Sequence, residues 1–381
     1  MRVAIIGVGW AGFRPSTPHV SYKELMFEAA QRAYADANID PRTEVHSFVC
    51  CTEDFWQGNS IADEYMPDQL GAVLRPLCTI AGDGLLGVAT AWMQIQSGLA
   101  DLVVVEAHSK LSEVHTPEAI LQFAYDPIWT RVLHPPPLFL AGLEMRRYLQ
   151  ETGNRRDGCA AVVVKNRKHA LRNPDASYPA ALEPADVLAS PFVAEPLTEA
   201  EVSSSADGAI VCVIASERRA KEAQSPIYIG GIGWSTADPW VEDRDYSTAE
   251  YAALSARQAY RRAGLGSPAR AVDLAEIDDT FAYKELQHLE ALGLCPRGRA
   301  AALTLNGVTD RDGQVPVNVS GGALGVGHMV DATGLQRLLF AVLQLRGQAG
   351  LQQLSGVGRA VVQSWRGLPT ASGAVTVLSA E

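Results

Sequence analysis

One histidine stands in a glycine-rich loop of this chain. His328 follows a β-like run that ends near Val319, and it precedes an apolar-periodic segment that begins at Leu335; five glycines fall between residues 321 and 334. This order predicts a strand, a loop and a helix, with an imidazole where the helix begins. Free N–H groups and a positive dipole end at such a helix start favour a developing oxyanion, and an imidazole donates a hydrogen bond or moves a proton near neutral pH. We therefore predict a catalytic loop with His328 as oxyanion donor or activator, and we place Gly322 and Gly327 in it.

A second candidate is the stretch Leu77-Cys78-Thr79-Ile80-Ala81-Gly82-Asp83-Gly84, which leads into an apolar helical segment ending near Gly98. A thiolate at a helix N-terminus is an activated nucleophile. Cys78 is therefore a candidate nucleophile, with Asp83 and Gly84 in the adjoining substrate loop. Its alternative role is that of a small buried apolar residue.

A third candidate is the block Asp278-Asp279-Thr280-Phe281-Ala282-Tyr283, which follows a predicted strand at residues 272–279. An ionised Asp278 would repel an enolate, whereas a protonated one could donate a hydrogen bond to it if burial raises the pKa. The alternative role of Asp278 is a helix cap. Asp83, Asp278 and Tyr283 are also candidate general bases.

The elements that must position these residues occur twice. Residues 2–12 and 226–236 are β-like runs that both end in Gly-x-Gly-Trp followed by a small residue. Each is followed by a helical pattern with a serine three residues before a glutamate, which predicts a capping box at Ser21–Glu24 and at Ser247–Glu250. Further matching pairs are 45–51 with 272–279, 82–98 with 325–347, and 101–107 with 359–364. The repeat predicts a duplicated α/β fold with halves 1–224 and 225–381.

Two segments depart from this repeat. A proline-rich stretch from about residue 113 to 200 carries two helical patterns, at Leu138–Glu151 and Asn154–Asn173, and we read it as an inserted loop domain folded over the first half. The run from Gly7 to Gly12 matches the dinucleotide fingerprint, but Pro15 follows too soon for a helix to open there. We therefore expect a tight turn at these glycines and no nucleotide site.

Composition sets the broad class. The 381 residues are 47% hydrophobic and 20% charged, which is typical of a globular protein of two ordinary domains. The net charge of −11 argues against a nucleic-acid partner, and no apolar run approaches the ~20 residues that span a bilayer. Six cysteines without paired spacing favour reduced thiols, with no disulfide framework and no metal site. The N-terminal run reads as a strand and not a signal peptide, so we expect a cytoplasmic protein.

Several of these motifs resemble those of thiolases. Gly327-His328 and Ala332-Thr333-Gly334 match a thiolase histidine motif, with Met329 and Asp331 where that family has proline and glycine. The stretch from Leu77 to Lys110 and the block from Asp278 to Pro296 resemble sterol carrier protein X type and archaeal acetyl-CoA acetyltransferase-like thiolases.

The resemblance also marks the altered positions. Ala81 stands where the nucleophilic cysteine belongs, and Cys78 lies three residues earlier. Asp278 replaces a histidine or asparagine that helps to bind the thioester oxygen. Trp365 and Arg366 occupy the C-terminal loop in which many thiolases keep a second cysteine.

The resemblance implies a fold of two mixed five-stranded sheets in five α-β-α-β-α layers, and a homodimer or homotetramer. It implies a coenzyme A thioester as substrate and no other cofactor. Basic residues of the inserted segment would hold coenzyme A, although a solvated helix face is the alternative; these are Arg155, Lys165, Arg167 and Lys168. A small OB-fold, zinc-ribbon protein is a possible partner.

Three functions follow as hypotheses. The first is an acetyl-CoA acyltransferase, with Cys78 as nucleophile and His328 as its activator. The second is a nucleophile-free retro-aldolase that acts on a β-hydroxyacyl-CoA and holds the enolate with oxyanion donors. The third is a non-catalytic acyl-CoA-binding subunit of a complex. The family favours an enzyme that makes or breaks acyl-CoA carbon–carbon bonds.

Overall fold

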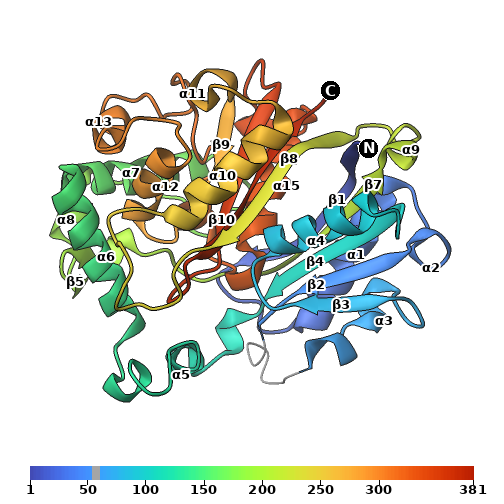
Figure 1. The fold of residues 1–381 in the computed structure, drawn as a ribbon, viewed down its shortest axis with the longest axis horizontal. Helices are drawn as coiled ribbons and strands as arrows, with labels where there is room; N and C mark the ends of the chain where they lie inside the picture. The colour runs from blue at the N-terminus through green and yellow to red at the C-terminus, as the bar shows by residue number, and fades with distance from the viewer. Residues whose placement is uncertain (54–60) are drawn as a thin grey trace.

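In the computed structural model, which describes residues 1–53 and 61–381, the two halves of the chain build one mixed sheet (Figure 1). Nine strands of the described residues have the order β3-β2-β4-β7-β1-β8-β11-β10-β9. The first half contributes β1 (Val3–Arg14), β2 (Ser47–Cys51), β3 (Leu77–Ile80), β4 (Leu102–Ser109) and β7 (Asp207–Ser216). The second contributes β8 (Ile227–Thr236), β9 (Leu274–Glu276), β10 (Arg359–Trp365) and β11 (Ser372–Ser379).

The two groups of strands meet through a short antiparallel pairing. Only Ala4–Tyr228 and Ile5–Ile227 join β1 to β8 among the described residues, so each group keeps its own twist. The first group has the five strands predicted. In the second, the fifth position is a single parallel bridge between Ala275 and Val317, because Pro316 has no N–H to extend the ladder.

The helices complete the layers. They are α1 (Tyr22–Ala37), α2 (Pro41–Glu44), α3 (Pro67–Leu70), α4 (Gly84–Gln96), α5 (Pro117–Gln122), α6 (Pro137–Thr152), α7 (Arg156–Ala170), α8 (Pro184–Ala189), α9 (Glu217–Ala220), α10 (Glu250–Ala263), α11 (Pro268–Ala271), α12 (Ala282–Ala291), α13 (Ala300–Leu305), α14 (Gly322–Val326) and α15 (Thr333–Leu345). Short 3₁₀ helices are η1 (Ala62–Glu64), η2 (Leu111–Glu113), η3 (Arg131–Leu133), η4 (Glu199–Glu201), η5 (Val330–Ala332) and η6 (Gly350–Gln352).

Three apolar cores confirm the five-layer thiolase fold. The central core holds α4 and α15 between the inner faces of the two strand groups. Helix α1 covers the outer face of the first group, and α10 and α12 cover that of the second. Both α4 and α15 therefore begin in the middle of the molecule, where their N-termini come together.

The capping of the repeated helices differs between the halves. Ser21 and Glu24 form the predicted capping box at α1, and Asn38 ends this helix in the left-handed region. The second predicted box, at Ser247–Glu250, is wrong. Helix α10 begins at Glu250, which is its first residue and cannot reach back as the third, so no side chain caps it.

The expected tight turn at Gly7–Gly12 is also wrong, because β1 continues through these glycines to Arg14. A Cβ on Gly9 would lie 2.2 Å from the carbonyl oxygen of Ala29, and one on Gly233 would lie 2.1 Å from that of Ser255. The repeated Gly-x-Gly pattern thus lets a helix pack directly on a strand in each half.

The inserted segment contains the two predicted helices as α6 and α7, followed by α8 and a separate hairpin of β5 (Phe192–Ala194) and β6 (Leu197–Thr198). We expected it to fold over the first half, and the loop after α7 does contact that half: Trp10 donates to Asp175, and the Ser177 hydroxyl donates to the carbonyl oxygen of Phe13, both at 3.1 Å. Helix α7 packs against α12, α13 and α14, because its apolar face, with Cys159, Val162 and Val163, joins the core of the second half. Figure 1 shows this green segment beside the orange helices of the second half. The division of the chain at 224/225 stays a prediction.

Candidate active site

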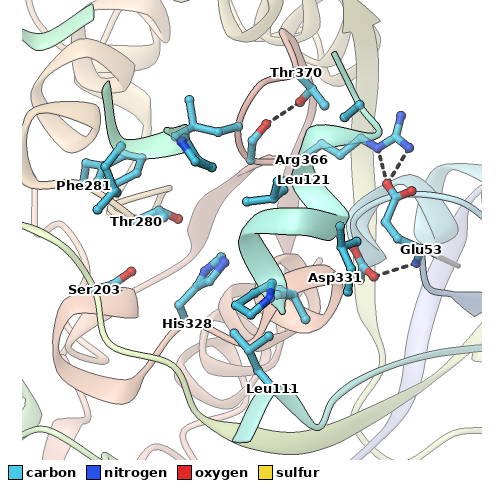
Figure 2. A pocket seen from close by; sticks show the side chains of 18 of the residues that line it. Glu53, Leu111, Leu121, Ser203, Thr280, Phe281, His328, Asp331, Arg366 and Thr370 are labelled. Atoms are coloured by element: carbon cyan, nitrogen blue, oxygen red, sulfur yellow. Dashed lines mark hydrogen bonds and ion pairs between the residues drawn. The ribbon is translucent and has the colours of Figure 1, made fainter. Parts of the chain in front are cut away.

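A cavity of about 600 Å³ lies where the inserted segment meets both halves. Its apolar wall comes mainly from η2, α5, the start of α6 and the loop after β10, with side chains such as Leu111, Leu121, Leu138 and Leu368. Its polar lining is Glu53, Ser203, Thr280, His328, Asp331, Arg366 and Thr370. In Figure 2, Ser203 and Thr280 lie on one side of His328, and the other labelled polar residues, Asp331, Glu53, Arg366 and Thr370, lie toward the opposite side of the view. The cavity can therefore hold an apolar group next to a small set of proton donors and acceptors.

Backbone contacts fix the position of His328. Its N–H donates to the carbonyl oxygen of Ser204 at 2.8 Å, and its own carbonyl accepts the N–H of Ala206 at 2.9 Å. Gly327 precedes it with φ at +115°, and a Cβ there would lie 2.5 Å from the Cβ of Ala206. Only glycine fits this approach, so the loop presents the imidazole in one place.

The hydrogen bonds of Thr333 assign the tautomer of His328. The Thr333 hydroxyl donates its one proton to the carbonyl oxygen of Val330 at 2.8 Å, and it lies 3.3 Å from Nδ1 of His328. Since that proton is used, the hydroxyl accepts from Nδ1–H. The Nε2 atom then carries a lone pair, which makes it a proton acceptor.

The charge state of His328 follows from its surroundings. Burial lowers its pKa to about 4, against an opposing effect of the Asp278 carboxylate, while the Arg337 guanidinium lowers it further. The ring is therefore neutral near pH 7. A neutral imidazole with a free Nε2 is a general base first, and it becomes a donor once it has taken a proton.

Asp278 lies behind this wall and not in the cavity lining. It is 1% exposed and forms an ion pair of 2.9 Å with Arg337 of α15. Burial raises its pKa, but Arg337, His288 and the N–H of Thr280 outweigh that effect and hold the pKa below its usual value. Asp278 is thus a carboxylate, which contradicts the hypothesis of a protonated oxyanion donor. It does not cap α12 either, because the N-cap of that helix is Phe281.

Cys78 lies on the edge strand β3, outside the cavity lining. Its Sγ is 3.8 Å from the carbonyl oxygen of Phe48, and burial raises the pKa of its thiol. A raised pKa keeps a thiol protonated and less reactive at neutral pH. The structure therefore does not bring Cys78 to His328.

Asp83 and Gly84 join helices and do not line the cavity. Asp83 is the N-cap of α4 and accepts the N–H of Leu85 at 2.9 Å, and its other oxygen accepts the N–H of Gly334 in α15 at 2.8 Å. Burial raises the pKa of Asp83 to about 6. Gly84 lets Leu335 approach, since a Cβ there would lie 2.5 Å from its Cγ.

Tyr283 and Gly322 are also buried away from the cavity. The Tyr283 hydroxyl donates to Glu144 at 2.8 Å, and its ring stacks on Phe281, which does line the cavity. Gly322 has φ at +58° and makes room for the Asp279 carboxylate, which accepts the N–H groups of Ala323 and Leu324. Both residues support the walls of the site.

The four predicted coenzyme A-binding residues do not all meet at one site, and their role stays a prediction. Lys165 is buried in an ion pair of 2.8 Å with Glu285, and Arg155 is exposed and paired with Asp157. Arg167 lies over the ring of Tyr178. Lys165 and Lys168 both line a separate basin of about 300 Å³, and none of the four lines the main cavity.

From the sequence we did not select Glu53, Asp331 or Arg366 as site residues, although all three line the cavity together with His328. Arg366 forms an ion pair with Glu53, whose N–H donates to Asp331 at 2.8 Å (Figure 2). Arg366 also lies beside Gly82, where a Cβ would be 3.6 Å from its Nε. Asp331 and Arg366 could have been selected from the sequence, because both stand where the chain departs from the thiolase motifs.

No group of three or more histidine, cysteine, aspartate or glutamate side chains in residues 1–53 and 61–381 is arranged to hold a metal ion. Within the same ranges, no helix is long and apolar enough to cross a membrane.

Comparison with known proteins agrees with this architecture. The thiolase C-terminal domain-like family matches residues 234–380. The acetyl-CoA acetyltransferase of Methanothermobacter thermautotrophicus is 29% identical over 93% of both chains. The benzoylsuccinyl-CoA thiolase subunit BbsB of Thauera aromatica is 28% identical over 94% of this chain and 92% of its own.

Solved structures extend the likeness to the whole fold. The Ltp2-ChsH2(DUF35) aldolase has a TM-score of 0.85 and 25% identity, covering 99% of this chain and 97% of its own. The acetyl-CoA acetyltransferase of Syntrophomonas wolfei has a TM-score of 0.76 at 18% identity, covering 100% and 99%.

The layered fold and the matched domain define a thiolase-like α/β protein. Residues 234–380 match the thiolase C-terminal domain-like family, and the chain resembles archaeal acetyl-CoA acetyltransferases and sterol carrier protein 2, of which the bovine protein is 28% identical over 93% of this chain. The resemblance seen in the sequence is confirmed.

Proposed function

We propose that this protein cleaves a carbon–carbon bond of a β-hydroxyacyl-CoA thioester by a retro-aldol reaction. The observation that carries the proposal is the cavity around His328, whose lining in the described part of the chain includes a neutral base and hydroxyl groups but no cysteine. The likeness to an aldolase structure over 99% of the chain supports the same reaction class. Retro-aldol cleavage needs a base and an oxyanion donor, and it needs no covalent nucleophile.

In the first step, Nε2 of His328 takes the proton of the β-hydroxyl group. The C–O⁻ electrons form the new carbonyl, the bond between Cα and Cβ breaks, and its electron pair passes into the thioester as an enolate. The Nδ1–H bond to Thr333 keeps the ring in the tautomer that this step requires. The imidazolium that results is a hydrogen-bond donor beside the developing negative charge.

Ser203 is the hydroxyl best placed to assist. Its Oγ is buried without a hydrogen-bond partner among the described residues, and the residue lines the cavity. Figure 2 shows Ser203 and Thr280 on the same side of the His328 ring. A buried unsatisfied hydroxyl is costly, so a substrate oxygen that accepts from Ser203 would bind favourably. The apolar wall, with Leu121 and Phe281, holds the acyl group and keeps water from the enolate.

The proposal includes how the protein is assembled. Acyl-CoA is the substrate, and the proposed reaction uses no cofactor besides this coenzyme A thioester. We expect a homodimer or homotetramer that also binds a small OB-fold, zinc-ribbon subunit. The description of BbsB as a subunit and of the aldolase as a complex with a DUF35 protein supports a partner chain. The cytoplasmic location stays a prediction.

Intact-protein mass after incubation with acetyl-CoA, together with a cleavage assay, tests this function. We expect no acetyl adduct, and we expect release of a shorter acyl-CoA from members of a panel of branched and cyclic β-hydroxyacyl-CoA esters. An acetyl adduct that disappears in Cys78→Ala would instead establish acyl transfer through Cys78. Failure to bind any CoA ester would point to a non-catalytic subunit.

A further inference from the structure

Two acidic side chains line the cavity, and the aldol steps described above do not use them. Glu53 follows β2, and Asp331 lies in η5, three residues after His328. Asp331 is 4% exposed, and its Oδ2 accepts the N–H of Glu53 at 2.8 Å. The two carboxyl groups therefore share one wall of the site.

Only one of these carboxyl groups has a cationic partner. Arg366 is ion-paired with Glu53, whereas Asp331 forms no salt bridge with any residue in 1–53 or 61–381. Two neighbouring carboxyl groups in a buried site do not both ionise readily, and the one without a cation keeps its proton. Burial and then the Glu53 charge raise the pKa of Asp331 well above its usual value.

The backbone beside Asp331 supports a specific role for it. Val330 has φ at +39°, in the left-handed region that β-branched residues rarely adopt. Such strain persists where the surrounding structure imposes it, and it clusters at functional sites. Here it turns the chain so that Val330, His328 and Asp331 all line one cavity.

We propose that Asp331 is a carboxylic acid in the resting enzyme and that it gives its proton to the α-carbon of the thioester enolate. This inference rests on the proposed retro-aldol function and adds its second half. The carboxyl O–H bond breaks as a C–H bond forms at Cα, and the enolate electron pair supplies that bond. Asp331 is left as a carboxylate, and the proton held by His328 returns to it through solvent. The net reaction moves the β-hydroxyl proton to Cα.

The groups around Asp331 set the direction of its pH dependence. Glu53 and Asp83 raise its pKa, and the Arg366 guanidinium lowers it. The Cys51 thiol lies on the same side, and β4 and β7, which also pack against η5, add apolar side chains of the central core. Since Asp331 must be protonated to act, activity falls as pH rises through its pKa. Glu53→Gln should move that loss to lower pH, and Arg366→Gln should move it to higher pH.

Infrared spectroscopy of the isolated protein tests the resting state without any substrate. We expect the wild type minus Asp331→Asn difference spectrum at neutral pH to contain the carbonyl band of a protonated carboxyl group. Glu276, whose pKa burial raises to about 7, contributes equally to both proteins and cancels in the difference. Glu53→Gln should lower the pH at which this band disappears. Glu118→Gln, an exposed site on α5, is the matched control and should leave the band unchanged. A difference spectrum without this band would overturn the assignment.

Deuterium exchange at the α-carbon of propionyl-CoA in D₂O tests the proton transfer apart from cleavage. Exchange begins with the reverse of the proposed step: the carboxylate form of Asp331 takes the α-proton, exchanges it with solvent and returns a deuteron to Cα. We expect exchange by the wild type and a loss of about 10²–10⁴-fold in Asp331→Asn, the range of general acid–base catalysis. The amide of Asp331→Asn still offers an oxygen that accepts the Glu53 N–H. If Asp331 had only this structural role, the exchange rate of the variant would stay near that of the wild type, and that result would contradict the proposal. If the band and the exchange depend on Asp331 but no β-hydroxyacyl-CoA is cleaved, the proposed function fails and the assignment of Asp331 stands.

Discussion

The starts of α4 and α15 occupy corresponding places in the two halves, yet they differ in what they face. The α4 start is closed, because the Asp83 carboxylate accepts the N–H groups of Leu85 and Gly334 and is 1% exposed. The loop before α15 is open to the cavity through His328 and Asp331. The repeated fold thus brings two helix N-termini together, and the buried Asp83 carboxylate accepts an N–H group from each of them. The α15 side differs because the loop before it also presents side chains to the cavity.

This difference coincides with the positions at which the chain departs from the thiolase motifs. A thiolase nucleophile belongs at the α4 start, where this chain has Ala81, a buried Asp83 and the guanidinium of Arg366 beside Gly82. The acid–base groups that remain lie on the α15 side. The proposed reaction therefore depends on proton transfer from one loop, and the other loop holds the two halves together.

Among substitutions in the open loop before α15, replacing His328 should have the largest effect. In His328→Ala the base is lost, so we expect the rate of β-hydroxyacyl-CoA cleavage to fall by about 10²–10⁴-fold. Steady-state kinetics with circular dichroism as a fold control measures this. His328→Asn should be no better, because an amide cannot take the proton. Cleavage at more than a tenth of the wild-type rate would mean that another group is the base.

Among substitutions at the closed start of α4, replacing Asp83 should have the largest effect, and the effect should be on stability. Asp83→Ala leaves two buried N–H groups without acceptors, so we expect the free energy of unfolding to fall by about 2–4 kcal/mol. Urea denaturation measures it. Asp83→Asn keeps an acceptor oxygen and should lose less.

Asp83 should also give the unfolding free energy a pH dependence. Its pKa is raised from 3.8 to about 6 by burial, so the folded state binds the proton more tightly than the unfolded state. Stability should therefore fall as pH rises through this interval and level off above it. Asp83→Asn should flatten that part of the profile relative to wild type, and an unchanged slope would count against a buried titrating Asp83.

The sequence predicted features that depend on near neighbours and missed those that depend on distant ones. The capping box at Ser21–Glu24 and the loop around His328 are local patterns, and both are present. The contact of Glu53 with Asp331 joins residues 278 positions apart, and no local pattern encodes it. Asp278 was identified as unusual, but its charge state depends on Arg337 from another helix.

A smaller effect concerns the acidic side of the pH–rate profile. Burial lowers the pKa of His328 to about 4, and the Asp278 carboxylate opposes that shift. Activity needs the neutral ring, so it should rise with pH through this value. Asp278→Asn removes the opposing charge, and we expect the acidic limb of kcat/KM to move to lower pH with little change on the plateau. A shift to higher pH would show that Asp278 does not act on His328 electrostatically.

The smallest effect should come from Cys78→Ala, which tests whether the thiol near the α4 start takes part in the reaction. Cys78 is half-buried on β3, and its thiol is not part of the cavity lining. We expect cleavage to stay within about twofold of wild type and the free energy of unfolding to fall by about 1 kcal/mol or less, since a partly buried small side chain is removed. Kinetics and urea denaturation on the same preparation measure both. A loss of activity as large as that of His328→Ala, with the fold intact, would return the nucleophile to the α4 side and reverse the roles of the two loops.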